Sequence, residues 1–160
     1  MGMEEKKWKN LLISVAVSLS VGIMSALLSM GGMRAYADMY KPPLSPPGWV
    51  FPIVWTILYV LMGIAAFLVF QSVGEDKKLA LTLYVIQLFL NFGWSIIFFD
   101  LKAYFFAFAW LLVLWLFIYL AMKQFRQLNK TAGILMLPYL AWVAFAGYLN
   151  LAIAIYYSIH

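Results

Sequence analysis

The chain has 160 residues, of which 66% are hydrophobic and only 11% are charged. This composition excludes an ordinary soluble domain, in which about 25% of residues are charged. The absence of cysteine from the sequence excludes disulfide bonds and thiolate metal sites. We therefore expect residues 1–160 to form a single domain embedded in a membrane.

Five stretches without any Lys, Arg, Asp or Glu divide the chain, and each is long enough for a membrane-spanning helix. A bilayer core requires about 20 apolar residues per helix, and burying a charge in lipid is costly. The predicted fold class is an all-α integral membrane protein, a bundle of five transmembrane helices with a long lid loop between the first two. The spans are expected at about residues 10–30, 49–71, 79–99, 103–122 and 131–157, and the lid loop at residues 31–48.

The basic residues indicate the orientation in the membrane. The N-terminus, the second loop and the fourth loop together carry eight Lys and Arg residues, whereas the other side carries three. Because basic residues favour the cytoplasmic side, we expect the N-terminus in the cytoplasm and the C-terminus outside, in a multi-pass protein of a bacterial cell membrane. The net charge of +5 is then a topology signal and does not indicate a nucleic-acid partner.

The loop at residues 31–48 differs from the other connections, which are short and polar. Four of the six prolines lie between Pro42 and Pro47, and Pro52 follows where the second span must begin. Proline fixes φ and lacks a hydrogen-bond donor, so this segment is stiff and extended. Long loops in compact domains are usually functional lids or disordered, and the prolines favour a lid over one end of the bundle.

Small residues recur along one face of the first span, at Ser14, Ser18, Gly22 and Ala26. A spacing of four residues lets another helix approach closely within lipid. Packing within the bundle is the simpler interpretation, and a dimer face is the alternative.

Polar residues share one face of the third span, at Gln87, Asn91 and Ser95. A buried amide without a partner costs several kcal/mol, so this face must point into the bundle. It either forms hydrogen bonds between helices or places a polar anchor in an otherwise apolar cavity. In the fifth span, Asn150 is expected to bond to a neighbouring helix.

Aromatic residues recur at helical spacing in the second and fifth spans. Trp55 and Tyr59 share one face, and Trp142 lies next to the small Ala146, which leaves room for a flat molecule. Aromatic stripes more often serve packing or the headgroup region, but Trp55 lies too deep for a headgroup contact. Pro138 predicts a kink or an irregular first third of the fifth span.

The sequence offers few groups for catalysis. The only histidine is His160, and the predicted spans contain no carboxylate. Hydrolysis, phosphoryl transfer and metal catalysis lack their residues, and proton relays normally use Asp, Glu or His within the membrane. No metal site and no required cofactor is expected. What remains is an aromatic cavity with amides, suited to a flat apolar ligand.

Three motifs give the chain a family resemblance. They are PPGWVFP at residues 46–52 with WTILY at 55–59, QLFLN at 87–91 with Trp94-Ser95, and LPYLAW at 137–142 with Leu149-Asn150. In this order and spacing they resemble the TspO/MBR family. This family comprises the mitochondrial translocator protein, or peripheral-type benzodiazepine receptor, and the bacterial tryptophan-rich sensory proteins.

The resemblance implies a five-helix bundle, often a homodimer, that binds tetrapyrroles such as protoporphyrin IX. It also implies binding of isoquinoline carboxamide and benzodiazepine-type ligands, and a role in porphyrin sensing, transport or regulation. Together with Gln87 of the polar face, the expected pocket residues are Tyr36, Pro46, Trp55, Tyr59, Asn91, Trp94, Ser95, Trp142, Ala146 and Leu149.

Two other functions stay open. Some bacterial members of the family are proposed to degrade porphyrin in light, in a reaction tied to the tryptophans that match Trp55 and Trp142. Transport of porphyrin, lipid or sterol across the bilayer is the third possibility, although the chain lacks the repeats typical of transporters.

The chain departs from the family pattern at two places. Leu44 stands where members commonly carry tryptophan, which predicts a looser lid. No Lys or Arg follows Tyr148, so the C-terminal cholesterol motif of the animal proteins is missing, which argues against cholesterol as a partner.

Overall fold

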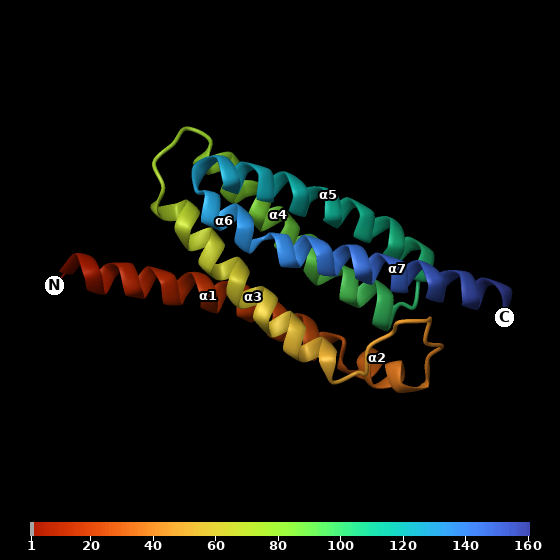
Figure 1. Cartoon of the computed structure of the whole chain (residues 1–160). Helices are drawn as coiled ribbons and strands as arrows, with labels where there is room; N and C mark the ends of the chain where they lie inside the picture. Colours follow the sequence, from red (N-terminus) through yellow and green to blue (C-terminus); the bar gives the residue numbers. More distant parts are fainter. Residues whose placement is uncertain (1) are drawn as a thin grey trace.

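The computed structural model describes residues 2–160, and these contain five helical spans long and apolar enough to cross a membrane, as predicted. The termini lie at opposite ends of the bundle (Figure 1). The elements are α1 (Gly2–Leu28), α2 (Met30–Ala35), the 3-10 helix η1 (Tyr36–Asp38), α3 (Val50–Gln71), α4 (Lys77–Ser95), the π-helix η2 (Ile96–Asp100), α5 (Tyr104–Leu128), α6 (Lys130–Leu135) and α7 (Leu137–Ile159).

Several spans are longer than the charge pattern predicts, and α5 continues to Leu128 instead of ending at residue 122. Helix α1 begins at Gly2, and Glu4 and Glu5 lie in its first turn, where carboxylates interact favourably with the helix dipole. The third span continues from α4 through η2 to Asp100. Charged residues thus extend helices beyond the apolar stretches from which the spans were predicted.

The fifth span is broken near its start, which confirms the irregular first third predicted from Pro138. Met136 separates α6 from α7, and Pro138 lies in the first turn of α7, where a missing N–H is tolerated. The preceding helix α6 is capped by Asn129, whose side-chain oxygen accepts a hydrogen bond from the Ala132 backbone nitrogen at 3.1 Å.

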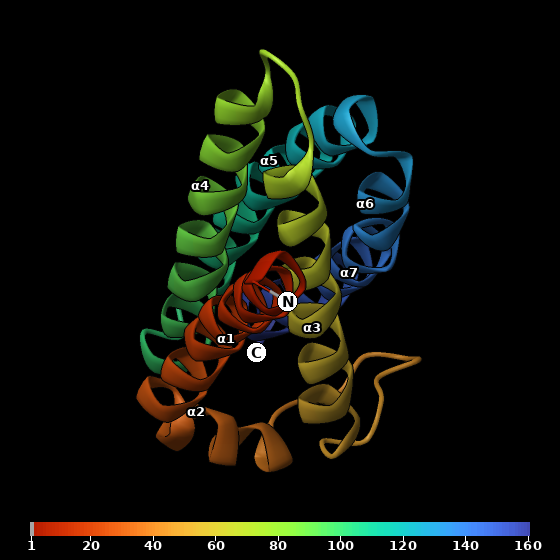
Figure 2. The same ribbon diagram turned by 90° about the vertical axis from the view of Figure 1, so that its left-hand side faces the viewer.

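Helices α1 and α3 meet along the stripe of small residues. Ser14 Oγ donates to the Gly63 carbonyl oxygen at 2.7 Å, and Ser18 Oγ donates to the Tyr59 carbonyl oxygen at 2.6 Å. Figure 2 shows α1 between α3 and α4 on one side of the bundle. Ser14 and Ser18 of the stripe therefore pack against α3 within the chain, as the simpler interpretation predicts, and the dimer face stays an untested alternative.

Helix α5 packs against both α4 and α7. Two tryptophans of α5 form hydrogen bonds to these helices. Trp110 Nε1 donates to the Leu90 carbonyl oxygen of α4 at 2.6 Å, and Trp115 Nε1 donates to the Leu140 carbonyl oxygen of α7 at 3.1 Å. These two hydrogen bonds pair the indole N–H groups with backbone carbonyl oxygens of neighbouring helices. Both tryptophans lie outside the cavity described below.

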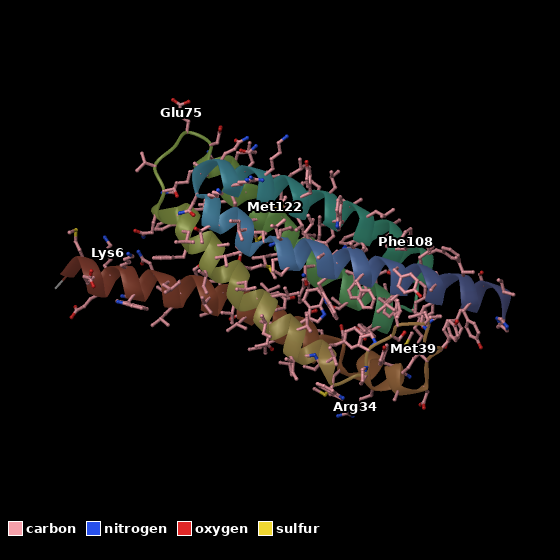
Figure 3. All side chains as sticks on the ribbon, viewed as in Figure 1. Lys6, Arg34, Met39, Glu75, Phe108 and Met122 are labelled. Carbon is pink, nitrogen blue, oxygen red and sulfur yellow. The ribbon has the colours of Figure 1, made fainter. Side chains whose placement is uncertain are left out.

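The connection between α1 and α3 lies at one end of the bundle, which we call the loop end (Figure 1). Arg34 and Met39 lie at this end, whereas Lys6 and Glu75 lie at the other (Figure 3). The connection starts with the short helices α2 and η1 and then has no regular secondary structure from Met39 to the start of α3, with turns at residues 43–44 and 48–49. It is thus partly helical, and not irregular throughout.

The segment at residues 39–48 is tied to the middle and to the last turns of α7. Tyr148 Oη donates to the Pro43 carbonyl oxygen at 2.8 Å. The Tyr40 backbone nitrogen donates to Tyr157 Oη at 3.1 Å, and the Tyr40 ring stacks on Tyr156 with centroids 3.9 Å apart. These contacts join residues more than a hundred positions apart in sequence and hold the segment against the bundle.

Candidate functional site

A cavity of about 300 Å³ lies inside the loop half of the bundle. Helices α1 and α4 contribute residues near their C-termini, α3 contributes residues near its N-terminus, and α7 contributes residues of its middle part. The lining comprises Leu19, Gly22, Ile23, Ser25 and Ala26 of α1, Tyr36, Ser45 and Gly48 of the connection, Phe51, Pro52, Trp55, Thr56 and Tyr59 of α3, Asn91, Trp94 and Ser95 of α4, Phe98 and Phe99 of η2, and Trp142, Ala146, Leu149, Asn150 and Ile153 of α7.

Aromatic rings form much of the cavity wall. The Trp55 ring lies 5.7 Å from the Tyr59 ring, and the Trp142 ring lies 5.8 Å from Phe51 in an edge-to-face arrangement. Ring pairs at such distances stabilise each other beyond the area they bury. The wall is thus assembled from aromatic residues that pack on one another across α3 and α7.

A chain of hydrogen bonds closes the inner end of the cavity. Tyr59 Oη donates to Asn91 Oδ1 at 2.6 Å, Asn91 Nδ2 donates to Tyr139 Oη at 2.6 Å, and Tyr139 Oη donates to Gln87 Oε1 at 2.7 Å. Gln87 Nε2 contacts Met62 Sδ at 3.7 Å. The network joins α3, α4 and α7 and satisfies buried polar groups that would otherwise be costly.

Most other polar side chains of the wall are also paired within the protein. Trp94 Nε1 donates to Asn150 Oδ1 at 3.0 Å, and Asn150 Nδ2 donates to the Tyr104 carbonyl oxygen at 2.8 Å. The hydroxyls of Ser25 and Ser95 are hydrogen-bonded to each other. The prediction that Asn150 bonds to a neighbouring helix is confirmed.

The Trp142 indole nitrogen differs from these groups. It is buried and has no hydrogen-bond partner among the described residues. An unpaired donor in an apolar wall has a free-energy cost that a ligand acceptor can remove. None of the described residues that line the cavity is charged. The cavity therefore suits a flat, largely apolar molecule.

Tyr36 lies where the connection meets the cavity. Its hydroxyl donates to the Pro46 carbonyl oxygen at 3.4 Å, and its ring packs edge-to-face on Phe51 at 5.3 Å. Burial raises the pKa of Tyr36 above its usual value, so the hydroxyl remains a neutral donor. Lys41 Nζ donates to the carbonyl oxygens of Tyr36 and Ala37 at 3.1 Å and 2.9 Å, which fixes the turn that presents Tyr36.

Replacing Tyr148 by phenylalanine should loosen the connection without changing the cavity lining. The substitution removes the hydrogen bond to Pro43, so hydrogen exchange at the amides of residues 39–48 should become about 2- to 10-fold faster. Tyr119→Phe is the matched control, because Tyr119 is similarly exposed on α5, which is far from the connection in sequence. Equal exchange in both variants would show that Tyr148 does not hold the segment.

Comparison with known proteins identifies the chain. The sequence profile of the TspO/MBR family matches residues 14–156. The chain belongs to the TspO/MBR family. A tryptophan-rich protein TspO of Chlorobaculum tepidum is 36% identical over 151 residues, covering 92% of this chain and 96% of the relative. A tryptophan-rich sensory protein of Cereibacter sphaeroides is 44% identical over 115 residues, covering 72% of each chain. The human translocator protein is 36% identical over 140 residues, covering 86% of this chain and 83% of the relative.

The structure brings most of the predicted site residues of this TspO/MBR chain into one cavity. Those that line it are Tyr36, Trp55, Tyr59, Asn91, Trp94, Ser95, Trp142, Ala146 and Leu149. Pro46 does not line it and acts through its carbonyl oxygen on Tyr36. Gln87 does not line it either, because its side chain is fully buried and bonded to Tyr139, one turn deeper than Asn91.

Sequence reasoning missed two parts of the wall. Helix α1 provides one side through Leu19, Gly22 and Ile23, although the small-residue stripe had been interpreted as packing or as a dimer face and not as a cavity wall. Phe98 and Phe99 provide another part, because the π-helical turn of η2 extends the α4 wall toward the loop end. The stripe offered a signal for the first part, whereas the apolar run at residues 96–99 offered none for the second.

Leu44 lies outside the cavity, at the tip of the connection. Its backbone adopts φ 71°, and 82% of its side chain is exposed. A left-handed backbone is costly for a residue with a Cβ atom. Because Leu44 does not contribute to the lining, closure of the connection rests on Tyr36, Tyr40 and Lys41 instead.

Proposed function

We propose that this TspO/MBR protein is a membrane receptor and binding protein for flat, largely apolar ligands of the tetrapyrrole type, including protoporphyrin IX, and for isoquinoline carboxamide-type molecules. The observation that carries the proposal is the uncharged aromatic cavity, with Trp55 and Trp142 in its wall and an unpaired indole donor at Trp142. Indole rings stack on extended π-systems and can donate one hydrogen bond.

The size and charge of the cavity further define the binding mode. Ligand sites usually have volumes of about 300–1,000 Å³, and this cavity is at the lower limit with the connection in place. A tetrapyrrole macrocycle therefore requires the connection to move outward. Since the described lining carries no charge, the ligand's carboxylates should stay at the loop end, near exposed cations such as Arg34 and Lys41.

A titration of protoporphyrin IX, followed by the change in its own absorbance, tests this proposal. Trp142→Leu removes the ring and the free donor, so the dissociation constant should rise about 5- to 100-fold. Trp49→Leu is the matched control, because Trp49 is 68% exposed and does not line the cavity. The affinity of this variant for protoporphyrin IX should not change. If both variants bind like the unaltered protein and all three show the same Tm, the proposed cavity does not hold the porphyrin.

Light-dependent porphyrin breakdown is the second candidate, since both Trp55 and Trp142 line the cavity. The measurement is the rate at which bound protoporphyrin IX loses its absorbance under illumination in air. An enzymatic role predicts slower loss with the double variant Trp55→Phe/Trp142→Phe at equal ligand occupancy. Equal rates for both proteins and for free porphyrin would leave binding as the function.

A further inference from the structure

A second hollow lies at the loop end, on the other side of Phe98 and Phe99. It is a groove whose walls come from five elements: α2, η1, η2, the first turn of α5 and the last turns of α7. The argument rests on Asp38, Met39, Phe99, Lys102, Phe105 and Tyr157, all of which line it. Asp38 and Lys102 do not line the central cavity, so the groove has charges where the cavity has none.

The walls of the groove are held in fixed positions. A Cβ atom at Gly32 would lie 2.5 Å from the Phe99 carbonyl oxygen, so α2 rests directly on the backbone of η2. Lys102 follows η2 with φ 52°, a left-handed conformation that is unfavourable for a residue with a Cβ atom. The turn thus sets Lys102 beside the groove in a conformation that its own backbone does not favour.

The groove combines opposite charges with an aromatic surface. The side chains of Asp38 and Lys102 are both exposed. Lys102 lies between the third and fourth spans, and Asp38 lies in the connection between the first and second spans. Phe105, which is 52% exposed, continues the groove onto the outer face of α5. A phospholipid of the surrounding bilayer offers the matching chemistry, since acyl chains suit Phe105 and a zwitterionic headgroup suits the two charges.

We infer that this groove binds the headgroup of phosphatidylethanolamine from the leaflet at the loop end. Its phosphate accepts hydrogen bonds from Lys102 Nζ, and its primary ammonium donates to the Asp38 carboxylate. Phosphatidylcholine has no N–H donor for Asp38, and phosphatidylglycerol has no ammonium, so both should bind more weakly. The acyl chains then lie along Phe105.

The groove and the central cavity share Phe98 and Phe99. The Phe98 ring stacks on Trp94 at 5.2 Å, and the Phe99 ring packs edge-to-face on Phe98 at 4.9 Å. A lipid that fills the groove packs against the outer side of the wall that Phe98 and Phe99 form between the groove and the cavity. Lipid in the groove should therefore affect how the cavity wall moves when a ligand enters.

Native mass spectrometry of the full chain, released from bilayer discs containing equal amounts of the three phospholipids, tests the inference without any porphyrin. The unaltered protein should retain phosphatidylethanolamine about 3- to 10-fold over the other two lipids, as expected for exposed charge pairs. The double variant Asp38→Asn/Lys102→Gln should lose this preference.

The control is Arg34→Gln/Asp100→Asn, which removes the same two charge types at the same end. Arg34 and Asp100 do not line the groove, so this variant should keep the preference. Equal retention of all three lipids by the unaltered protein overturns the inference, as does an equal loss in the control. If Lys102→Gln leaves lipid retention unchanged but weakens protoporphyrin IX binding, Lys102 serves the cavity ligand and the lipid assignment is wrong.

Discussion

Alanine at position 63 should lower the free energy of unfolding by about 2–4 kcal/mol, because it forces α1 away from α3. A Cβ atom at Gly63 would lie 2.5 Å from Val15 Cα and 2.9 Å from Ser18 Oγ. The first of these atoms belongs to the backbone, so the helices themselves must separate. Separation also weakens the hydrogen bonds that Ser14 and Ser18 donate to α3.

Gly147→Ala is the matched control for this prediction. Gly147 is also a buried helical glycine, but a Cβ atom there would meet only side-chain atoms, at 3.1 Å from Leu111 Cδ2 and 4.0 Å from Phe108 Cε2. Both substitutions gain the same helix propensity of about 1 kcal/mol, so the difference between them isolates the steric effect. The measurement is thermal unfolding in detergent, and equal Tm values for the two variants would contradict the close α1–α3 contact.

Removing the Tyr139 hydroxyl should cost about 1–3 kcal/mol of stability, since Tyr139→Phe leaves Asn91 Nδ2 and Gln87 Oε1 without partners. Tyr139 is fully buried, so water cannot replace the lost bonds at low cost. Asn91 should then turn, which also disturbs the hydrogen bond from Tyr59 at the cavity floor.

Tyr84→Phe provides the contrast within the same core. Tyr84 is 6% exposed, and its buried hydroxyl has no hydrogen-bond partner among the described residues. Removing that hydroxyl should therefore leave stability unchanged or increase it. The measurement is the Tm of both variants in thermal unfolding. A larger decrease in Tm with Tyr84→Phe than with Tyr139→Phe would show that the hydrogen-bond network contributes less to stability than its geometry implies.

Much of the fold could be predicted because charge is so costly in lipid. The charge-free stretches locate all five spans of the described chain, and most of the span ends agree to within about two residues. They fail where helices continue into water, as at Gly2–Asn10 in α1, because the N-terminal charges suit the helix dipole. The orientation of the termini, which the basic residues indicate, stays a prediction.

The site was predicted less completely, for reasons that particular residues explain. Spacing places Gln87 and Asn91 on one face, but it cannot show that Tyr139 from a distant helix lies between them. That residue determines which amide belongs to the cavity floor and which to the core below. Likewise, the step from α4 to the π-helical η2 rotates Phe98 and Phe99 into the wall, and no regular periodicity predicts such a turn.

The hydrogen-bonded floor closes the cavity toward the end of the bundle that carries Lys6 and Glu75. Met62, Gln87 and Tyr139 are each fully buried and lie one turn further from the loop end than the lining residues. A molecule that crossed the bundle would have to break the whole Tyr59–Asn91–Tyr139–Gln87 chain. We therefore expect a ligand of this cavity to enter and leave without passing the floor.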